Sequence, residues 1–293
     1  MKNLYFTIYF LLVFALYFVP LKALGVISLD SELYSHFLLI PLVSLYFMFM
    51  DRKAILLKTG FSFGVALPVV AAGLLLFWLG KGNQAGLNQN DYLSLMMFSF
   101  FLCINGGFIG FYGSRAYRKA LFPLLFLIFM VPIPMVILDW LIKVLLIGSA
   151  ETSYAIFQVL GVPVFRDGFV FELPGLAVEV ARQCSGIRST IGMFITSVIA
   201  GYMMLRTGWG RVALIIAVFP ITIFKNSIRI CSISLLAAYV DKSWVTDSWL
   251  HSSGGIVFFV LGLIILGGVL LFIQKLEKKT HGSRRKEADF QKN

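Results

Sequence analysis

The chain has 293 residues, of which 59% are hydrophobic and only 13% are charged. A soluble globule needs far more polar surface, so the composition excludes a soluble domain and predicts a polytopic membrane protein. The net charge of +11 fits an excess of Lys and Arg in cytoplasmic loops better than a nucleic-acid partner, and we expect no nucleic acid.

The first half of the chain is a series of apolar runs joined by short polar links. The runs cover about residues 4–24, 34–50, 61–80 and 92–113, and a fifth begins at 120. Each is long enough to cross a hydrocarbon core of roughly 30 Å. Pro132-Ile133-Pro134 should kink or end the fifth run, because each proline ring removes a backbone donor.

The second half begins with a different pattern. Residues 135–161 are amphipathic, which predicts a helix at or near the membrane interface. Short β-rich runs then flank Arg166-Asp167-Gly168, which indicates a hairpin on the way to Cys184. Further apolar runs cover about 184–205, 212–240 and 251–273. We therefore expect an all-α polytopic bundle of about eight spans, forming one transmembrane domain over residues 1–293 with a basic cytoplasmic tail at 275–293.

The distribution of basic residues predicts the orientation. About 16 of the 25 Lys and Arg fall on one side in this arrangement, at positions 2, 52–58, 115–119, 206–211 and 275–292. The positive-inside rule then makes both termini cytoplasmic, in a cell inner membrane, and puts the hairpin, Cys184 and His251 on the outer face.

Three chemically distinct side chains are expected at the same depth. Cys184 begins one apolar run and His251 begins another at the outer face. Arg229 lies about 18 residues into its helix from the cytoplasmic start, or roughly 26 Å at 1.5 Å per residue. The sequence thus predicts equal depth, whereas lateral contact among the three is not determined by it.

These residue types match the needs of nucleophilic catalysis. A thiol must become a thiolate to attack, and a neighbouring cation favours that form. His251 could take up the proton and return it to a leaving amine. The Arg229 guanidinium could stabilise a developing oxyanion, and an Arg within a membrane is a functional hypothesis by default.

Each of these residues also has a structural interpretation. Cys184 could be a packing residue, as we expect for Cys103 and Cys231, and His251 could simply cap a helix. Arg229 could form an ion pair with Glu179 or Asp241.

Other candidates play supporting roles in this hypothesis. Asn226 shares a motif with Arg229, and Arg188 lies one turn beyond Cys184, where it could tune the thiol or pair with a lipid headgroup. His36 is a weaker candidate near the outer end of the second run. The three cysteines show neither disulfide nor metal spacing, so we expect no metal and no cofactor.

In the order of its motifs, the chain resembles the exosortase/archaeosortase family of multi-pass membrane cysteine transpeptidases. The resemblance covers nearly the whole chain and includes Tyr34-Ser35-His36, Pro132-Ile133-Pro134, Gly161-Val162-Pro163-Val164, Cys184-Ser185-Gly186-Ile187-Arg188-Ser189, Pro220, Asn226-Ser227-Ile228-Arg229, His251 and Gly255. Phe37 and Gln183 depart from the family pattern, which usually has Gly and Ala there. His251, where archaeal relatives often have Arg, favours a bacterial exosortase.

The resemblance implies that Cys184 is the nucleophile, Arg229 the essential cation and His251 the third member. It also implies partners: membrane-anchored proteins whose C-terminal sorting signal combines a short motif, a transmembrane helix and a basic cluster. Cleavage would pass through a thioacyl enzyme, and the acceptor that resolves it is left open.

Two alternatives remain at this point. A transporter or channel could bind an anion at Lys225, Asn226 and Arg229 in a broken helix. An inactive scaffold could keep the family shape without reactivity at Cys184.

Overall fold

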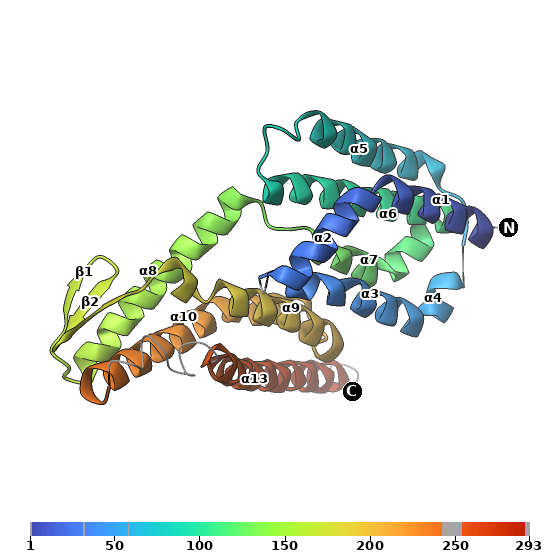
Figure 1. The fold of residues 1–293 in the computed structure, drawn as a ribbon. Coiled ribbons are helices and arrows are strands. Elements are labelled where there is room, and N and C mark those ends of the chain that lie inside the picture. Colours follow the sequence, from blue (N-terminus) through green and yellow to red (C-terminus); the bar gives the residue numbers. More distant parts are fainter. Residues whose placement is uncertain (1, 32, 58, 242–253, 291–293) are drawn as a thin grey trace. The chain divides into compact units, whose positions relative to one another are not determined.

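The computed structural model describes residues 2–31, 33–57, 59–241 and 254–290, without the side chains of 183, 254 and 280–290. The described chain is helical apart from one small sheet, which confirms the predicted all-α membrane class (Figure 1). It divides into two compact units, Met1–Leu138 and Asp139–Asn293. The prediction of a single domain over the whole chain stays a prediction.

The first unit contains seven α-helices, two short 3-10 helices and the start of an eighth α-helix in its described part. Their bounds are α1 (Lys2–Leu16), α2 (Phe18–Asp30), η1 (Ser35–Leu38), α3 (Leu39–Met50), α4 (Arg52–Leu56), α5 (Phe63–Gly82), α6 (Gln89–Lys119), α7 (Leu121–Phe126), η2 (Leu127–Met130) and the first residues of α8 (Met135–Val159). α5 and α6 lie side by side along their lengths (Figure 1).

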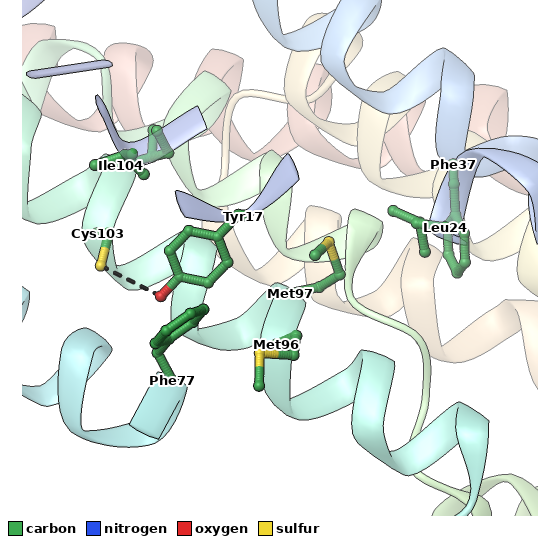
Figure 2. Packing of buried hydrophobic residues seen from close by; sticks show 9 residues of the cluster. Tyr17, Leu24, Phe37, Phe77, Met96, Met97, Cys103 and Ile104 are labelled. Carbon is green, nitrogen blue, oxygen red and sulfur yellow. Dashed lines mark hydrogen bonds between the residues drawn. The ribbon is translucent and has the colours of Figure 1, made fainter. Parts of the chain in front are cut away.

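A cluster of buried side chains around Tyr17 and Cys103 holds α1, α5 and α6 together. The Tyr17 ring packs edge-on against Phe77 with centroids 4.9 Å apart, and its hydroxyl lies 3.7 Å from the Cys103 sulfur (Figure 2). Tyr17 also hydrogen-bonds the Ser99 hydroxyl. Cys103 is fully buried here and is therefore a packing residue, as predicted.

The second unit consists of the rest of α8, a sheet and three long helices. These are β1 (Phe165–Asp167), β2 (Val170–Leu173), β3 (Leu176–Glu179), η3 (Arg182–Ser185), α9 (Ile187–Met204), α10 (Gly208–Tyr239) and α13 (Gly254–Phe290). α10 packs against both α9 and α13, which also contact each other, and a buried cluster joins the three helices (Figure 1).

The sheet has the strand order β1-β2-β3, with both pairs antiparallel. The predicted hairpin at Gly168 is confirmed, and Gly168 has the positive φ of 58° that its tight turn requires. A second hairpin follows through Pro174 and Gly175, whose φ is 76°. One face of the sheet buries Phe171 against Phe157 of α8, so the sheet is fixed to the helices.

The described residues contain up to seven candidate membrane spans, compared with the about eight that we expected for the whole chain. Among the described residues five helices are long and apolar enough to cross a membrane, or up to seven if each of two bent pairs forms one span. The first expected span breaks at Tyr17 into α1 and α2, bent by 69°. The chain bends by 86° at Pro132-Ile133-Pro134, where a break was predicted, and α8 forms the helix that was expected after it.

Two segments that we expected to be non-helical, the basic loop at 114–119 and most of the tail at 275–293, belong to helices. α6 continues past a kink at Gly113 (φ 87°) through the basic residues 114–119. A Cβ at Gly113 would lie 2.5 Å from the Gly60 carbonyl oxygen, so only glycine fits this crossing. α13 likewise extends to Phe290 through most of the expected cytoplasmic tail.

Candidate active site

Cys184 lies in a short turn between the sheet and α9. The sequence predicts that a helix begins at Cys184, but the residue belongs to η3, and α9 begins only at Ile187. Gly186 between them has a φ of 73°, which a β-carbon would disfavour, and this left-handed residue separates the two helices. The Cys184 amide donates to the Ala181 carbonyl over 2.8 Å. The thiol therefore sits on a closed turn rather than on a regular helix.

The first turn of α9 ties this turn to the helix. The hydroxyls of Ser189 and Thr190 donate to the Gly186 carbonyl over 2.8 and 2.9 Å. The buried Lys225 of α10 in turn donates to the Ser189 oxygen over 2.6 Å. Lys225 is only 3% exposed, so this bond satisfies an ammonium group that is shielded from solvent.

Asn226 connects three elements at the site. Its side-chain amide donates to the Cys184 carbonyl over 2.7 Å and to the Ser149 hydroxyl of α8 over 3.0 Å. Both N–H bonds of the amide are thus used within a residue that is 1% exposed. A Cβ at Gly186 would lie 3.3 Å from the Asn226 oxygen, so glycine also permits this close approach. Asn226 holds the Cys184 turn against α8 and α10.

One pocket combines the nucleophile candidate with the cation candidate. It is formed between β3 and the C-terminal half of α10, and together with the open space at its mouth it measures about 450 Å³. Its lining residues are Val178, Glu179, Val180, Cys184, Arg229, Ile230, Ile233 and Ser234. The fold therefore brings Cys184 and Arg229 to the same pocket, whereas the sequence predicts only that they lie at the same depth.

The remaining predicted residues are distributed differently. Arg188 is exposed in the first turn of α9 and does not line this pocket. His36 lies in η1 of the first unit, with its ring edge-on to Phe37. Glu179 is exposed at the end of β3, and its carboxylate makes no ion pair within the described residues. His251 lies outside the described residues.

Sequence reasoning missed three serines near the site. Ser149 and Ser189 support the Cys184 turn through Asn226 and Lys225. Ser234 lines the pocket, is 0% exposed, and its hydroxyl has no hydrogen-bond partner among the described residues. In the sequence each is a small polar residue in an apolar helix, a pattern that ordinary helix packing also produces.

Cys231 shows the environment of a packing thiol. It is 3% exposed in the cluster below the sheet, and its sulfur lies 3.5 Å from the Ser153 carbonyl. Cys184, in contrast, is partly exposed and lines the pocket. Within the described residues, no group of three or more His, Cys, Asp or Glu side chains could hold a metal ion.

Comparison with known proteins supplies the family. Residues 28–268 match the family described as Transmembrane exosortase (Exosortase_EpsH). No curated protein and no solved structure matches the chain. The match contains η1, the whole sheet, the Cys184 turn and the full length of α10. The chain therefore belongs to the transmembrane exosortase family, multi-pass membrane proteins with a transpeptidase or protease role on substrates that carry sorting signals.

Proposed function

We propose that this protein is a cysteine transpeptidase of the inner membrane that removes the C-terminal sorting signal of exported proteins. The observation that supports it most is that Cys184 and Arg229, from different elements, line one pocket. A nucleophile beside a fixed cation is the arrangement that acyl transfer requires.

In the proposed reaction, the Cys184 thiolate attacks the carbonyl carbon of the scissile peptide bond and forms a carbon–sulfur bond. The carbonyl electron pair moves to oxygen, and the Arg229 guanidinium stabilises this oxyanion. When the carbon–nitrogen bond breaks, His251 gives a proton to the departing amine of the transmembrane tail. The exported part of the substrate is left as a thioester on Cys184.

A second nucleophile then attacks the thioester carbon and gives its proton to His251, and the carbon–sulfur bond breaks to return the Cys184 thiolate. A hydroxyl or amine acceptor gives transpeptidation, whereas water gives simple proteolysis. Both termini are proposed to be cytoplasmic, because the expected basic loops then lie inside. A substrate helix with its basic end inside would present its motif at the outer interface, at the proposed depth of Cys184.

The anion-transport alternative is less well supported. It requires Asn226 to bind a solute, but both of its N–H bonds are used by the Cys184 carbonyl and the Ser149 hydroxyl. Lys225 is bonded to Ser189. Binding an anion there would break the contacts that hold the Cys184 turn.

Cys184→Ala tests the proposal, and Cys231→Ala is the matched control because that thiol is buried in packing. Both variants are expressed with a tail-bearing substrate from the same genome, and tail removal is followed by its change in mass. We expect Cys184→Ala to abolish tail removal while Cys231→Ala retains it. Continued processing by a correctly folded Cys184→Ala protein would refute the assignment of Cys184 as the nucleophile.

A further inference from the structure

Within the described residues, one edge of β3 carries no neighbouring strand. In that part of the chain β3 pairs with β2 alone, and the Val180 amide donates to the Phe169 carbonyl over 2.9 Å in continuation of that ladder. Hydrogen-bonded pairs alternate along an antiparallel ladder, so Val178 also directs its N–H and C=O toward β2. The intervening residues Ala177 and Glu179 direct theirs to the opposite edge.

The backbone groups on this edge are available for pairing. The Glu179 carbonyl accepts from the Ala181 amide over 3.0 Å. The Ala177 N–H and C=O and the Glu179 N–H have no hydrogen-bond partner within the described residues. The side chains of Ala177 and Glu179 are exposed, while Val178 and Val180 pack toward the helices. An exposed edge of this kind is a ready template for another strand.

This edge continues into the pocket that holds Cys184 and Arg229. Val178, Glu179 and Val180 form one side of the pocket, and Ile230, Ile233 and Ser234 of α10 form the other. The buried hydroxyl of Ser234 has no partner in the described part of the chain. Ser234 differs from Ser153, the other buried serine hydroxyl without a partner among the described residues, in lining the pocket, so its hydroxyl is placed to bond a ligand there.

We propose that the substrate segment next to the scissile bond docks as an additional strand on the β3 edge. Its backbone pairs with Ala177 and Glu179, and one backbone group bonds the Ser234 hydroxyl. Alternate side chains of an extended peptide point the same way, so every second one lies against the aliphatic wall of Ile230 and Ile233. This inference rests on the proposed function and adds the mode of substrate recognition.

Backbone recognition predicts a difference between neighbouring amides that the substrate itself can reveal. The probe is a synthetic peptide with the residues just before the apolar tail of a secreted protein that carries the family's C-terminal signal. Each amide is replaced in turn by an ester, which removes one N–H and keeps the side chain. Binding is measured to the full-length Cys184→Ala protein in lipid nanodiscs, because binding does not need the reaction.

Within the described residues the Ala177 carbonyl is the unpaired acceptor of this edge, so we expect the ester that removes the N–H facing it to weaken binding by roughly two- to tenfold. Esters at the two neighbouring positions, whose N–H groups point away from β3, should have little effect. Equal effects at neighbouring positions, or no binding of the unmodified peptide, would overturn the proposal. Failure of the proposed function is a separate result, since it appears as tail removal that does not depend on Cys184.

Variants of the protein test the same proposal, and peptide binding by each is compared with that of a matched control variant. Glu179→Pro removes an outward N–H that the sheet does not use, whereas Glu179→Ala removes only the carboxylate. We expect the proline variant to bind less tightly than the alanine variant. Ser234→Ala should weaken binding, while Ser153→Ala, which removes another buried hydroxyl without a partner but outside the pocket, should not. Equal binding by Ser234→Ala and Ser153→Ala would contradict the assignment of Ser234.

Discussion

Asn226 offers the sharpest test of how the fold positions the thiol. Its side-chain amide donates to the Cys184 carbonyl over 2.7 Å and to the Ser149 hydroxyl over 3.0 Å. Asn226→Ala leaves two buried acceptors without their donor and opens a small cavity. Each unsatisfied buried group costs about 1–3 kcal/mol, so we expect the variant to lose about 2–6 kcal/mol of stability.

The same substitution should also impair the reaction. The Cys184 turn would no longer be fixed to α10, and a displacement of about 1 Å in a reacting group can cost up to about a hundredfold in rate. We therefore expect processing per folded molecule to fall by about 10- to 100-fold. Stability is measured by thermal unfolding in detergent, and processing by tail removal from a co-expressed substrate.

Asn105 is the matched control. It is 3% exposed in α6, donates to the Phe101 carbonyl over 2.8 Å and accepts from the Tyr117 hydroxyl over 3.0 Å. Asn105→Ala should cause a similar loss of stability and leave processing per folded molecule unchanged. If both variants reduce processing equally, Asn226 acts only through stability and the positioning argument is wrong.

Two further predictions concern packing within the second unit. A Cβ at Gly210 would lie 2.5 Å from a Glu277 carboxylate oxygen, which accepts from the backbone at the start of α10. Gly210→Ala should therefore lower stability by about 1–3 kcal/mol. The control is Gly208→Ala, whose Cβ would meet nothing within 4 Å and which should not lower stability. Equal unfolding temperatures for the two variants would contradict this packing. Ser189→Ala should destabilise by about 1–3 kcal/mol because it leaves the buried Lys225 ammonium without its partner, and adding Lys225→Met should restore much of the loss. Additive losses in that double-mutant cycle would mean that the two side chains do not interact.

The sequence was sufficient for the membrane class and for features set by local chemistry. Long apolar runs predicted helices, the Pro132 to Pro134 segment predicted a break, and Gly168 predicted a tight turn. Helix rise also predicted that Arg229 reaches the depth of Cys184. Each of these depends on residues close in sequence, so no tertiary information was needed.

Other features depend on contacts between distant residues. The break at Tyr17 has a local cause that our prediction missed, because Pro20 cannot donate to the Leu16 carbonyl and its ring crowds that carbonyl. The direction of the break depends on distant residues, since Tyr17 packs into the cluster around Cys103 with its hydroxyl on Ser99. The turn that carries Cys184 depends on Asn226, far along the chain. A serine such as Ser234 in an apolar helix has no sequence signal that distinguishes a pocket from helix packing.

The most direct test of the account is the mass of the enzyme during turnover. Purified protein in nanodiscs is mixed with a tail-bearing substrate without an added acceptor, quenched in acid and analysed by peptide mass spectrometry. The account predicts that the substrate's exported fragment is attached to Cys184 by a bond that hydroxylamine cleaves, and that the adduct is absent in Arg229→Ala. Tail removal by the wild-type protein with no adduct on Cys184 at any time, and undiminished tail removal by Cys184→Ala, would contradict it.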